Sequence, residues 1–151
     1  MTEPKSVREK TTDGPVPRPR RRKPAAVGGG TGPGTGVPAE LTLAAKAAYE
    51  KKAAGVVVLD LRTVQAFTDF FFICTGQNAR QVKAIADAVE AALAKDGHKP
   101  AHVEGYDRAN WILLDYFTFI VHVFAPEARE FYDIERLWGS AGRVEMPDPA
   151  A

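Results

Sequence analysis

"GYDRANWILLDYFTFIVHVF", residues 105–124, is dense in β-branched and aromatic residues and predicts two adjoining strands, at about 111–116 and 118–124. The connection between these strands would be short. Hairpin tips usually hold glycine or polar residues, because the turn geometry and the surrounding water favour them. The sequence instead places Trp111, Tyr116, Phe117 and Phe119 around this connection. The sequence therefore predicts more apolar area at the hairpin end than a turn normally exposes.

The rest of the fold is predicted from segments with strand-like or helix-like patterns. Helices are predicted at residues 38–53, 78–97 and 126–140, and strands at 55–62, 69–76 and about 101–105. With the hairpin, the order becomes α-β-β-α-β-β-β-α. Continuous apolar strands beside amphipathic helices predict one α/β (α+β) domain, with a mixed sheet of about five strands and two helices on one face.

The segment "PEAREFYDIERLWGS" (126–140) is predicted as a single helix. Pro126 suits the first helical position, and Gly139 would end the helix. Its apolar stripe consists of Phe131, Ile134, Leu137 and Trp138. Such a stripe marks the side that packs on the sheet.

Residues 1–38 differ in composition from everything that follows. They hold 8 Lys/Arg against 3 Asp/Glu, 7 of the 11 prolines and 7 of the 13 glycines, and no aromatic residue. Such a segment cannot bury enough apolar surface to offset the entropy lost on ordering. We expect a disordered basic tail at 1–38, a folded domain at 39–140 and a flexible C-terminal end at 141–151.

Two stretches of this tail invite a binding interpretation. The run "RPRRRKP" (18–24) can neutralise RNA phosphates through Arg18, Arg20, Arg21, Arg22 and Lys23. A solvated tail that keeps the chain soluble is the simpler interpretation. The stretch "VGGGTGPGTG" (27–36) contains no G-x-G-x-x-G in any register and follows no apolar strand. It is therefore interpreted as a flexible linker.

Cysteine count and hydropathy indicate the compartment. Cys74 is the single cysteine, so no disulfide can form within the chain, which fits a reducing cytoplasm. No apolar run reaches 18 residues, and the N-terminus lacks the apolar segment of a secretory signal. We expect a cytoplasmic protein with no membrane partner.

Five residues are candidate acid or base groups: Asp60, Asp69, Asp107, Asp115 and His122. Asp60 and Asp115 fall near strand ends, where a mixed sheet can gather carboxylates around a metal ion. With Asp69 they would suit a metal-dependent nucleotidyltransferase or a nucleotide-binding relative. The Gly-Ser loop and paired Asp-x-Asp that such enzymes use are absent, however, and aspartates at strand ends are ordinary turn formers.

The remaining reactive side chains do not form a recognisable metal-binding or catalytic group. His98 and His102 have the i, i+4 spacing of half a zinc site, but Pro100 between them opposes a helix. His122 lies among valines, and Cys74 lies in an apolar strand, so both are expected to be structural. We predict no metal, no cofactor and no catalysis.

For Trp111, Tyr116 and Phe117 together, a partner-binding patch is favoured over simple core packing.

Several linked motifs give the folded domain a family resemblance. "VVVLDLR", "FTDFFFICTG", "NARQVKAIAD", "GYDRANWILLDY", "VHVF" and "EAREFYDIERLWG" follow in this order over about residues 39–140. In sequence and separation they closely resemble the ribosomal silencing factor family, also called Iojap-like proteins. Because the resemblance rests on several motifs, it is far more specific than any one of them.

The resemblance implies a translational repressor rather than an enzyme. Members bind the large ribosomal subunit at ribosomal protein fourteen and sterically block joining with the small subunit when nutrients are scarce. The implied fold is a mixed five-stranded sheet with helices, similar to nucleotidyltransferases but without their active site. The family's partner contacts carry over to Trp111 and Tyr116, with Asp115 beside them, and isolated members are often homodimers.

This chain departs from the family at the tip of the hairpin. Members commonly have a Gly-Asp turn after the Asp-Tyr pair, whereas Phe117 and Thr118 stand there in this sequence. Phe117 adopts a positive φ less readily than glycine, so a different type of turn is expected. The same residue adds apolar area to the predicted interface.

Overall fold

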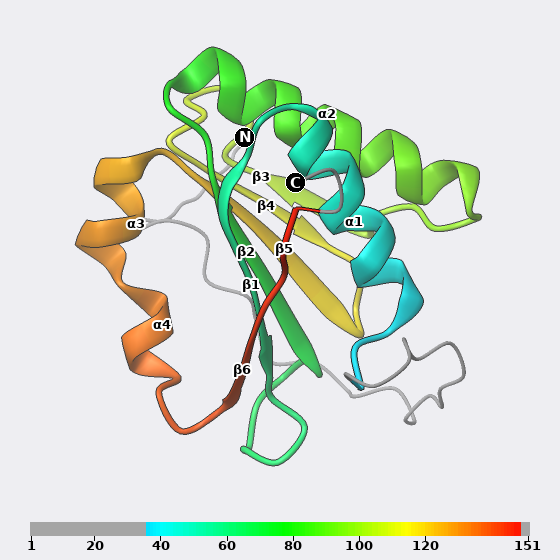
Figure 1. The fold of residues 1–151 in the computed structure, drawn as a ribbon, viewed down its shortest axis with the longest axis vertical. Coiled ribbons are helices and arrows are strands. Elements are labelled where there is room, and N and C mark those ends of the chain that lie inside the picture. The colour runs from blue at the N-terminus through cyan, green and yellow to red at the C-terminus, as the bar shows by residue number, and fades with distance from the viewer. Residues whose placement is uncertain (1–35, 149–151) are drawn as a thin grey trace, which may run out of the picture.

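A six-stranded mixed sheet forms the centre of the structure, a computed structural model that describes residues 36–148 (Figure 1). The strands are β1 (Ala54–Asp60), β2 (Phe70–Thr75), β3 (His102–Glu104), β4 (Trp111–Asp115), β5 (Phe119–Phe124) and β6 (Gly142–Glu145). Their order across the sheet is β3-β4-β5-β2-β1-β6. Strands β2 and β5 are parallel, and every other neighbouring pair is antiparallel. The predicted mixed sheet is confirmed.

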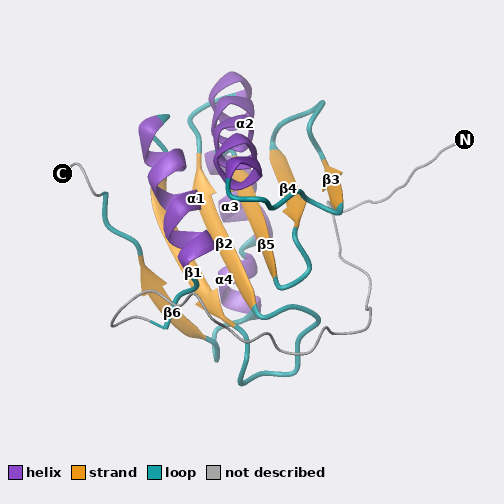
Figure 2. Cartoon of the chain, turned by 90° about the vertical axis from the view of Figure 1, so that its right-hand side faces the viewer, coloured by secondary structure: helices purple, strands orange, loops and turns teal. Residues whose placement is uncertain are grey.

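Helices cover both faces of this sheet, as Figure 2 shows. Helices α1 (Ala39–Glu50) and α2 (Ala79–Lys95) pack on one face, as predicted, in a core that includes Leu41 and Ile85. Helices α3 (Pro126–Tyr132) and α4 (Ile134–Leu137) lie on the opposite face. Among the described residues, no helix combines the length and apolar character needed to cross a membrane.

The continuous apolar run in β5 is explained by burial on both sides. Phe119, Val121 and Val123 face the core under α1 and α2. Ile120 and Phe124 face the core under α3 and α4, and all six residues of the strand are buried. A central strand covered on both faces has no solvent side, so its sequence does not alternate between polar and apolar.

Helix α2 follows its sequence pattern closely. The side chain of Asn78 accepts a hydrogen bond from the backbone N–H of Gln81 at 2.9 Å and so caps the first turn. The helical spacing of the apolar residues places five of them in the core, namely Val82, Ile85, Ala86, Val89 and Leu93. The predicted helix and its buried side are confirmed.

The end of the chain differs from the sequence prediction. Residues 142–145, expected to belong to a flexible end, form β6 and extend the sheet from five strands to six by pairing with β1. The hydroxyl of Tyr49 in α1 also donates to the backbone carbonyl of Met146. Strand β6 was missed because it is a short edge strand with two charged residues, Arg143 and Glu145, and therefore gives little apolar signal.

The predicted single helix at 126–140 is also corrected. Asp133 adopts a left-handed conformation, with φ 46° and ψ 50°, and separates α3 from α4. Asp is among the few residues that tolerate this conformation. The break changes which side chains face the sheet. Ile134 is buried and Trp138 packs against the core, whereas Phe131 and Leu137 face solvent.

Candidate functional site

Trp111 lies beneath α3, not on the surface. Its side chain is only 6% exposed. The indole ring stacks on Phe124 with centroids 4.9 Å apart and contacts the ring of Tyr132 at 4.6 Å. The expectation that Trp111 belongs to an exposed patch is therefore wrong, because the return of the chain through α3 covers the ring.

His122 is a buried structural residue next to this tryptophan. Its Nδ1 accepts a hydrogen bond of 3.0 Å from Trp111 Nε1, so the hydrogen of the neutral ring lies on Nε2. Among residues 36–148, Nε2 has no hydrogen-bond partner. The rings of His122 and Phe71 pack edge to face, with their centroids 4.5 Å apart. Burial among these rings lowers the pKa of His122 to about 3, so the side chain is not an acid or base at neutral pH.

Tyr116 is also part of the core. Its ring stacks on Phe119 with centroids 4.9 Å apart, on the face that α2 covers. Within the described chain its hydroxyl has no hydrogen-bond partner. Burial, together with the nearby charge of Glu90, raises the pKa of Tyr116 above its ordinary value. The hairpin thus buries two of the aromatics expected on its surface.

Phe117 is the residue that the hairpin does expose. Its side chain is 44% exposed, and its backbone has a φ of 74°. Thr118 donates its N–H to the carbonyl of Tyr116 at 2.9 Å, which closes a three-residue turn around Phe117. A left-handed conformation costs a residue with a Cβ roughly 1–2 kcal/mol. The turn therefore holds an aromatic in a position that normally requires glycine.

Two neighbouring side chains maintain this strained turn. Asp115 accepts a hydrogen bond from the backbone N–H of Phe117 at 2.9 Å. Thr68 donates its hydroxyl to the backbone carbonyl of Phe117 at 2.8 Å. Both Asp115 and Thr68 are buried. Thr68 precedes β2 and Phe117 precedes the neighbouring strand β5, 49 residues further along the chain, so sequence spacing cannot reveal this contact. Strained conformations persist where such contacts determine them, often at functional positions.

The three aspartates of the nucleotidyltransferase hypothesis lie at one end of the sheet, but Asp60 and Asp115 serve separate structural roles. Asp60 ends β1, Asp115 ends β4 and Asp69 precedes β2. Asp60 and Asp115 are separated by two intervening strands, which places them about 14 Å apart. Asp60 accepts two hydrogen bonds from the Arg62 guanidinium, at 2.9 and 2.7 Å, and these lower its pKa.

No metal centre is formed within the described part of the chain, where no three His, Cys, Asp or Glu side chains are grouped to hold an ion. Cys74 is buried, and burial raises its pKa to about 12, so its thiol stays protonated. The basic residues expected to contact RNA, Arg18, Arg20, Arg21, Arg22 and Lys23, lie outside the described residues.

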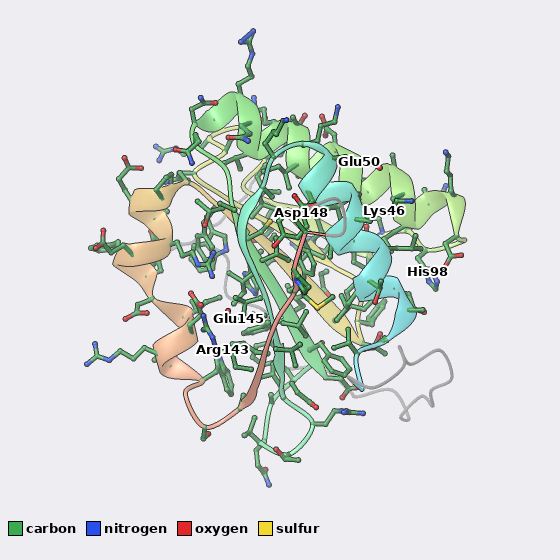
Figure 3. The ribbon with its side chains drawn as sticks, viewed as in Figure 1. Lys46, Glu50, His98, Arg143, Glu145 and Asp148 are labelled. Atoms are coloured by element: carbon green, nitrogen blue, oxygen red, sulfur yellow. The ribbon has the colours of Figure 1, made fainter. Side chains whose placement is uncertain are left out.

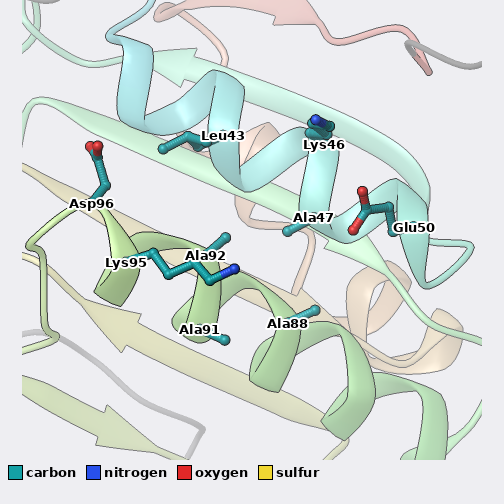
Figure 4. Close-up of a pocket in the computed structure, with 9 residues that line it drawn as sticks. All are labelled: Leu43, Lys46, Ala47, Glu50, Ala88, Ala91, Ala92, Lys95 and Asp96. Atoms are coloured by element: carbon teal, nitrogen blue, oxygen red, sulfur yellow. The ribbon is translucent and has the colours of Figure 1, made fainter.

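A groove between α1 and α2 has a volume of about 480 Å³ (Figure 4). Alanines such as Ala47, Ala88 and Ala92 line it. Its charged residues are of both signs, namely Lys46, Glu50, Lys95 and Asp96. This mixture of small apolar and oppositely charged side chains gives the groove no distinct ligand chemistry.

A surface that the sequence did not predict lies on α3 and α4. Phe131 is 79% exposed and Leu137 is 76% exposed, and no other large hydrophobic side chain among residues 36–148 is as exposed. Their helical spacing had placed them on the buried stripe. Asp133 is the residue that could have indicated their exposure. Aspartate tolerates a left-handed backbone conformation, and this permits the break between α3 and α4.

Arg129 fixes this pair of helices to the sheet. Its guanidinium binds both carboxylate oxygens of Glu135, at 2.9 and 3.0 Å. It also donates to the carbonyl of Gly55 at 2.8 Å and to the Thr75 hydroxyl at 2.9 Å. Arg143, labelled on β6 in Figure 3, adds a 2.8 Å contact to Glu135. These donors lower the pKa of Glu135, with Arg129 as the largest cause.

Comparison with known proteins identifies the family. Residues 35–151 match the family described as "Ribosomal silencing factor during starvation". The ribosomal silencing factor RsfS of Halalkalibacterium halodurans is 40% identical over 106 residues, which cover 70% of this chain and 91% of that protein. A more distant relative is the mouse protein named "Mitochondrial assembly of ribosomal large subunit protein 1", 26% identical over 59% of this chain and 40% of that protein.

A solved structure agrees with these relatives. The crystal structure of a Chromobacterium violaceum protein superposes with a TM-score of 0.65 and 34% identity, and the match covers 67% of this chain and 84% of the other. The match to the family description extends over more than three quarters of the sequence, including the hairpin, α3 and α4. By sequence and by fold, the chain belongs to the ribosomal silencing factor family.

Proposed function

We propose that the protein binds the large ribosomal subunit at ribosomal protein fourteen and blocks joining with the small subunit, so that translation falls when nutrients are scarce. The observation that carries this proposal is the family match over residues 35–151, whose description names ribosomal silencing during starvation. The name of the mouse relative adds a link to the large subunit. Steric blockade requires only that the bound protein occupy the joining surface.

The structure supports binding rather than catalysis as the activity. Asp60 is paired with Arg62, Asp115 accepts from the Phe117 backbone, and His122 is neutral and buried. In contrast, the turn at Phe117 projects an aromatic ring into solvent at the cost of backbone strain. An exposed aromatic on a backbone that hydrogen bonds hold in place is typical of a binding contact, because little backbone entropy is lost when a partner covers it.

Sedimentation tests this proposal. The full chain is mixed with purified large subunits, with purified small subunits and with isolated ribosomal protein fourteen. We expect the protein to pellet with the large subunit alone and to bind isolated ribosomal protein fourteen. Failure to pellet with the large subunit would falsify the proposal. Binding to the large subunit but not to ribosomal protein fourteen would move the site elsewhere on that subunit.

A further inference from the structure

The solvent-exposed residues of α3 and α4 include both apolar and acidic side chains. We propose that this α3–α4 face, defined as Phe131 and Leu137 with Glu127, Glu130 and Asp133, docks on a basic protein surface of the large ribosomal subunit. The inference rests on the proposed function and deepens it, because it assigns the contact to a protein rather than to RNA and to a face other than the hairpin. Tyr132 and Trp111 support the face from behind.

The two apolar side chains are the first observation. Phe131 and Leu137 are each more than three quarters exposed, although each lies only three residues from Ile134, which is buried. Single exposed hydrophobic residues are common on protein surfaces. Two large ones at such exposure on one short pair of helices leave apolar area in water that a partner would remove, which is the usual mark of an interaction site.

A chain of aromatic contacts links this face to the core. The ring of Phe131 meets the ring of Tyr132 edge-on at 5.0 Å. The ring centroid of Tyr132 in turn lies 4.6 Å from that of Trp111, which is buried and donates a hydrogen bond to His122. Trp111 is therefore a positioning residue: it holds Tyr132, and Tyr132 borders the exposed Phe131. Tyr132, which contacts both Trp111 and Phe131, loses little freedom when a partner covers it, and this favours affinity.

The helices that carry the face are themselves immobilised. Arg129 of α3 holds Glu135 of α4 through two hydrogen bonds and reaches β1 and β2 through Gly55 and Thr75. These bonds cross the break at Asp133. The outer face is consequently a preformed surface, and its exposed side chains need no rearrangement of α3 against α4 to meet a partner.

Charge decides what kind of partner fits. Glu127 and Glu130 are exposed on α3, and Asp133 lies between the helices. Arg136 is the exposed basic residue here and lies 3.9 Å from the Asp133 carboxylate. Residues 126–137 together hold four acidic and two basic residues. RNA phosphates would be repelled by this surface. A positively charged protein surface with apolar side chains complements both features.

The test measures the affinity of full-length variants for purified large subunits. Phe131→Ser with Leu137→Ser removes the apolar pair, and Val103→Ser, which changes an exposed apolar residue on β3, is the matched control. We expect the double variant to bind at least tenfold more weakly while its melting temperature stays close to that of the wild type, because both residues are exposed. If the wild type binds large subunits and the double variant binds them with the same affinity, the inference is overturned and the proposed function stays intact.

Charge reversal distinguishes a protein partner from RNA. Glu130→Lys should weaken binding to large subunits if the partner surface is basic. Stronger binding by Glu130→Lys would point to RNA and overturn the inference. The remaining alternative is that a second copy of this chain binds the α3–α4 face. Sedimentation velocity of the free wild type and of the double variant tests it. If the double variant binds subunits normally but no longer self-associates, a second copy covers the face, and the inference is again wrong. A wild type that does not bind at all contradicts the proposed function itself.

Discussion

Nε1 of Trp111 donates a hydrogen bond of 3.0 Å to Nδ1 of His122, and both side chains are buried on the face of the sheet that α3 and α4 cover. The bond fixes the neutral imidazole with its hydrogen on Nε2. It also orients the indole against Tyr132, whose ring lies 4.6 Å away. The pair belongs to the core, and its effect on binding would be exerted through α3.

His122 should make stability depend on pH. Its pKa is about 3 in the fold, against roughly 6.5 in an unfolded chain, so between these values the unfolded chain binds a proton that the folded chain does not. The stabilising effect is complete above pH 6.5 and is lost as pH falls toward 3. Urea denaturation should show the free energy of unfolding about 2 kcal/mol lower at pH 5.0 than at pH 7.5 from this residue alone.

His122→Gln is the matched control for this pH effect, because Gln can accept from Trp111 but does not titrate. Between pH 7.5 and pH 5.0, the free energy of unfolding of the variant should fall by about 2 kcal/mol less than that of the wild type. Asp60 and Glu135, whose pKa values are lowered, titrate mainly below pH 5 and cancel in the comparison. An identical pH dependence in the wild type and in His122→Gln would show that His122 is not buried in its neutral form.

Phe117 should reveal the strain of its turn when it is replaced by two small residues. Phe117→Gly relieves the positive φ of 74°, whereas Phe117→Ala keeps a Cβ there and removes only the ring. We expect the Gly variant to be more stable than the Ala variant by about 1 kcal/mol in urea denaturation. Both variants lack the ring, so both should bind the large subunit more weakly. An Ala variant as stable as the Gly variant would contradict the strained turn.

Arg129 should be the most important ionic residue of α3. Arg129→Ala removes the bonds to Glu135, Gly55 and Thr75 at once, and we expect it to lower the free energy of unfolding by about 2 kcal/mol. The control is Arg136→Ala, because Arg136 is 84% exposed and its contact to Asp133 measures 3.9 Å. That change should cost less than about 0.5 kcal/mol. Equal losses in the two variants would remove Arg129 from its assigned role.

If the basic tail contacts ribosomal RNA, binding to the large subunit should depend on salt through that contact. Replacing Arg18, Arg20, Arg21, Arg22 and Lys23 by Gln removes its positive cluster without shortening the chain. If each residue neutralises a phosphate, the slope of log affinity against log salt concentration should become shallower by roughly 0.7–0.9 for each basic side chain that is replaced. The measurement is binding to large subunits over a series of salt concentrations. An unchanged slope excludes the tail from the interface.

The parts of the fold that could be predicted are those whose periodicity has one physical cause. Helix α2 carries Asn78 as a cap and an apolar face at helical spacing, and the structure agrees. Strand β5 is a continuous apolar run because helices cover it on both sides. These local patterns are set by residues close in sequence, so they can be recognised without knowledge of tertiary contacts.

The candidate site was harder to predict because burial there depends on distant segments. Trp111 and Tyr116 were assigned to an exposed patch, since nothing in the hairpin itself shows that Tyr132 covers one ring and that the other lies in the core under α2. Conversely, Phe131 had the spacing of a buried residue, and a single left-handed residue, Asp133, changed the outcome. Strand β6 exists because β1 offers an open edge, which its own sequence does not indicate.

Blockade of subunit joining by the bound protein can be followed by light scattering. Large subunits are incubated with saturating full-length protein before small subunits are added, and the rise in scattering from joined particles is recorded. If the protein acts by steric blockade, the rise should be suppressed in proportion to the fraction of large subunits that carry the protein. Normal joining by large subunits that sedimentation shows to be fully occupied would rule out steric blockade.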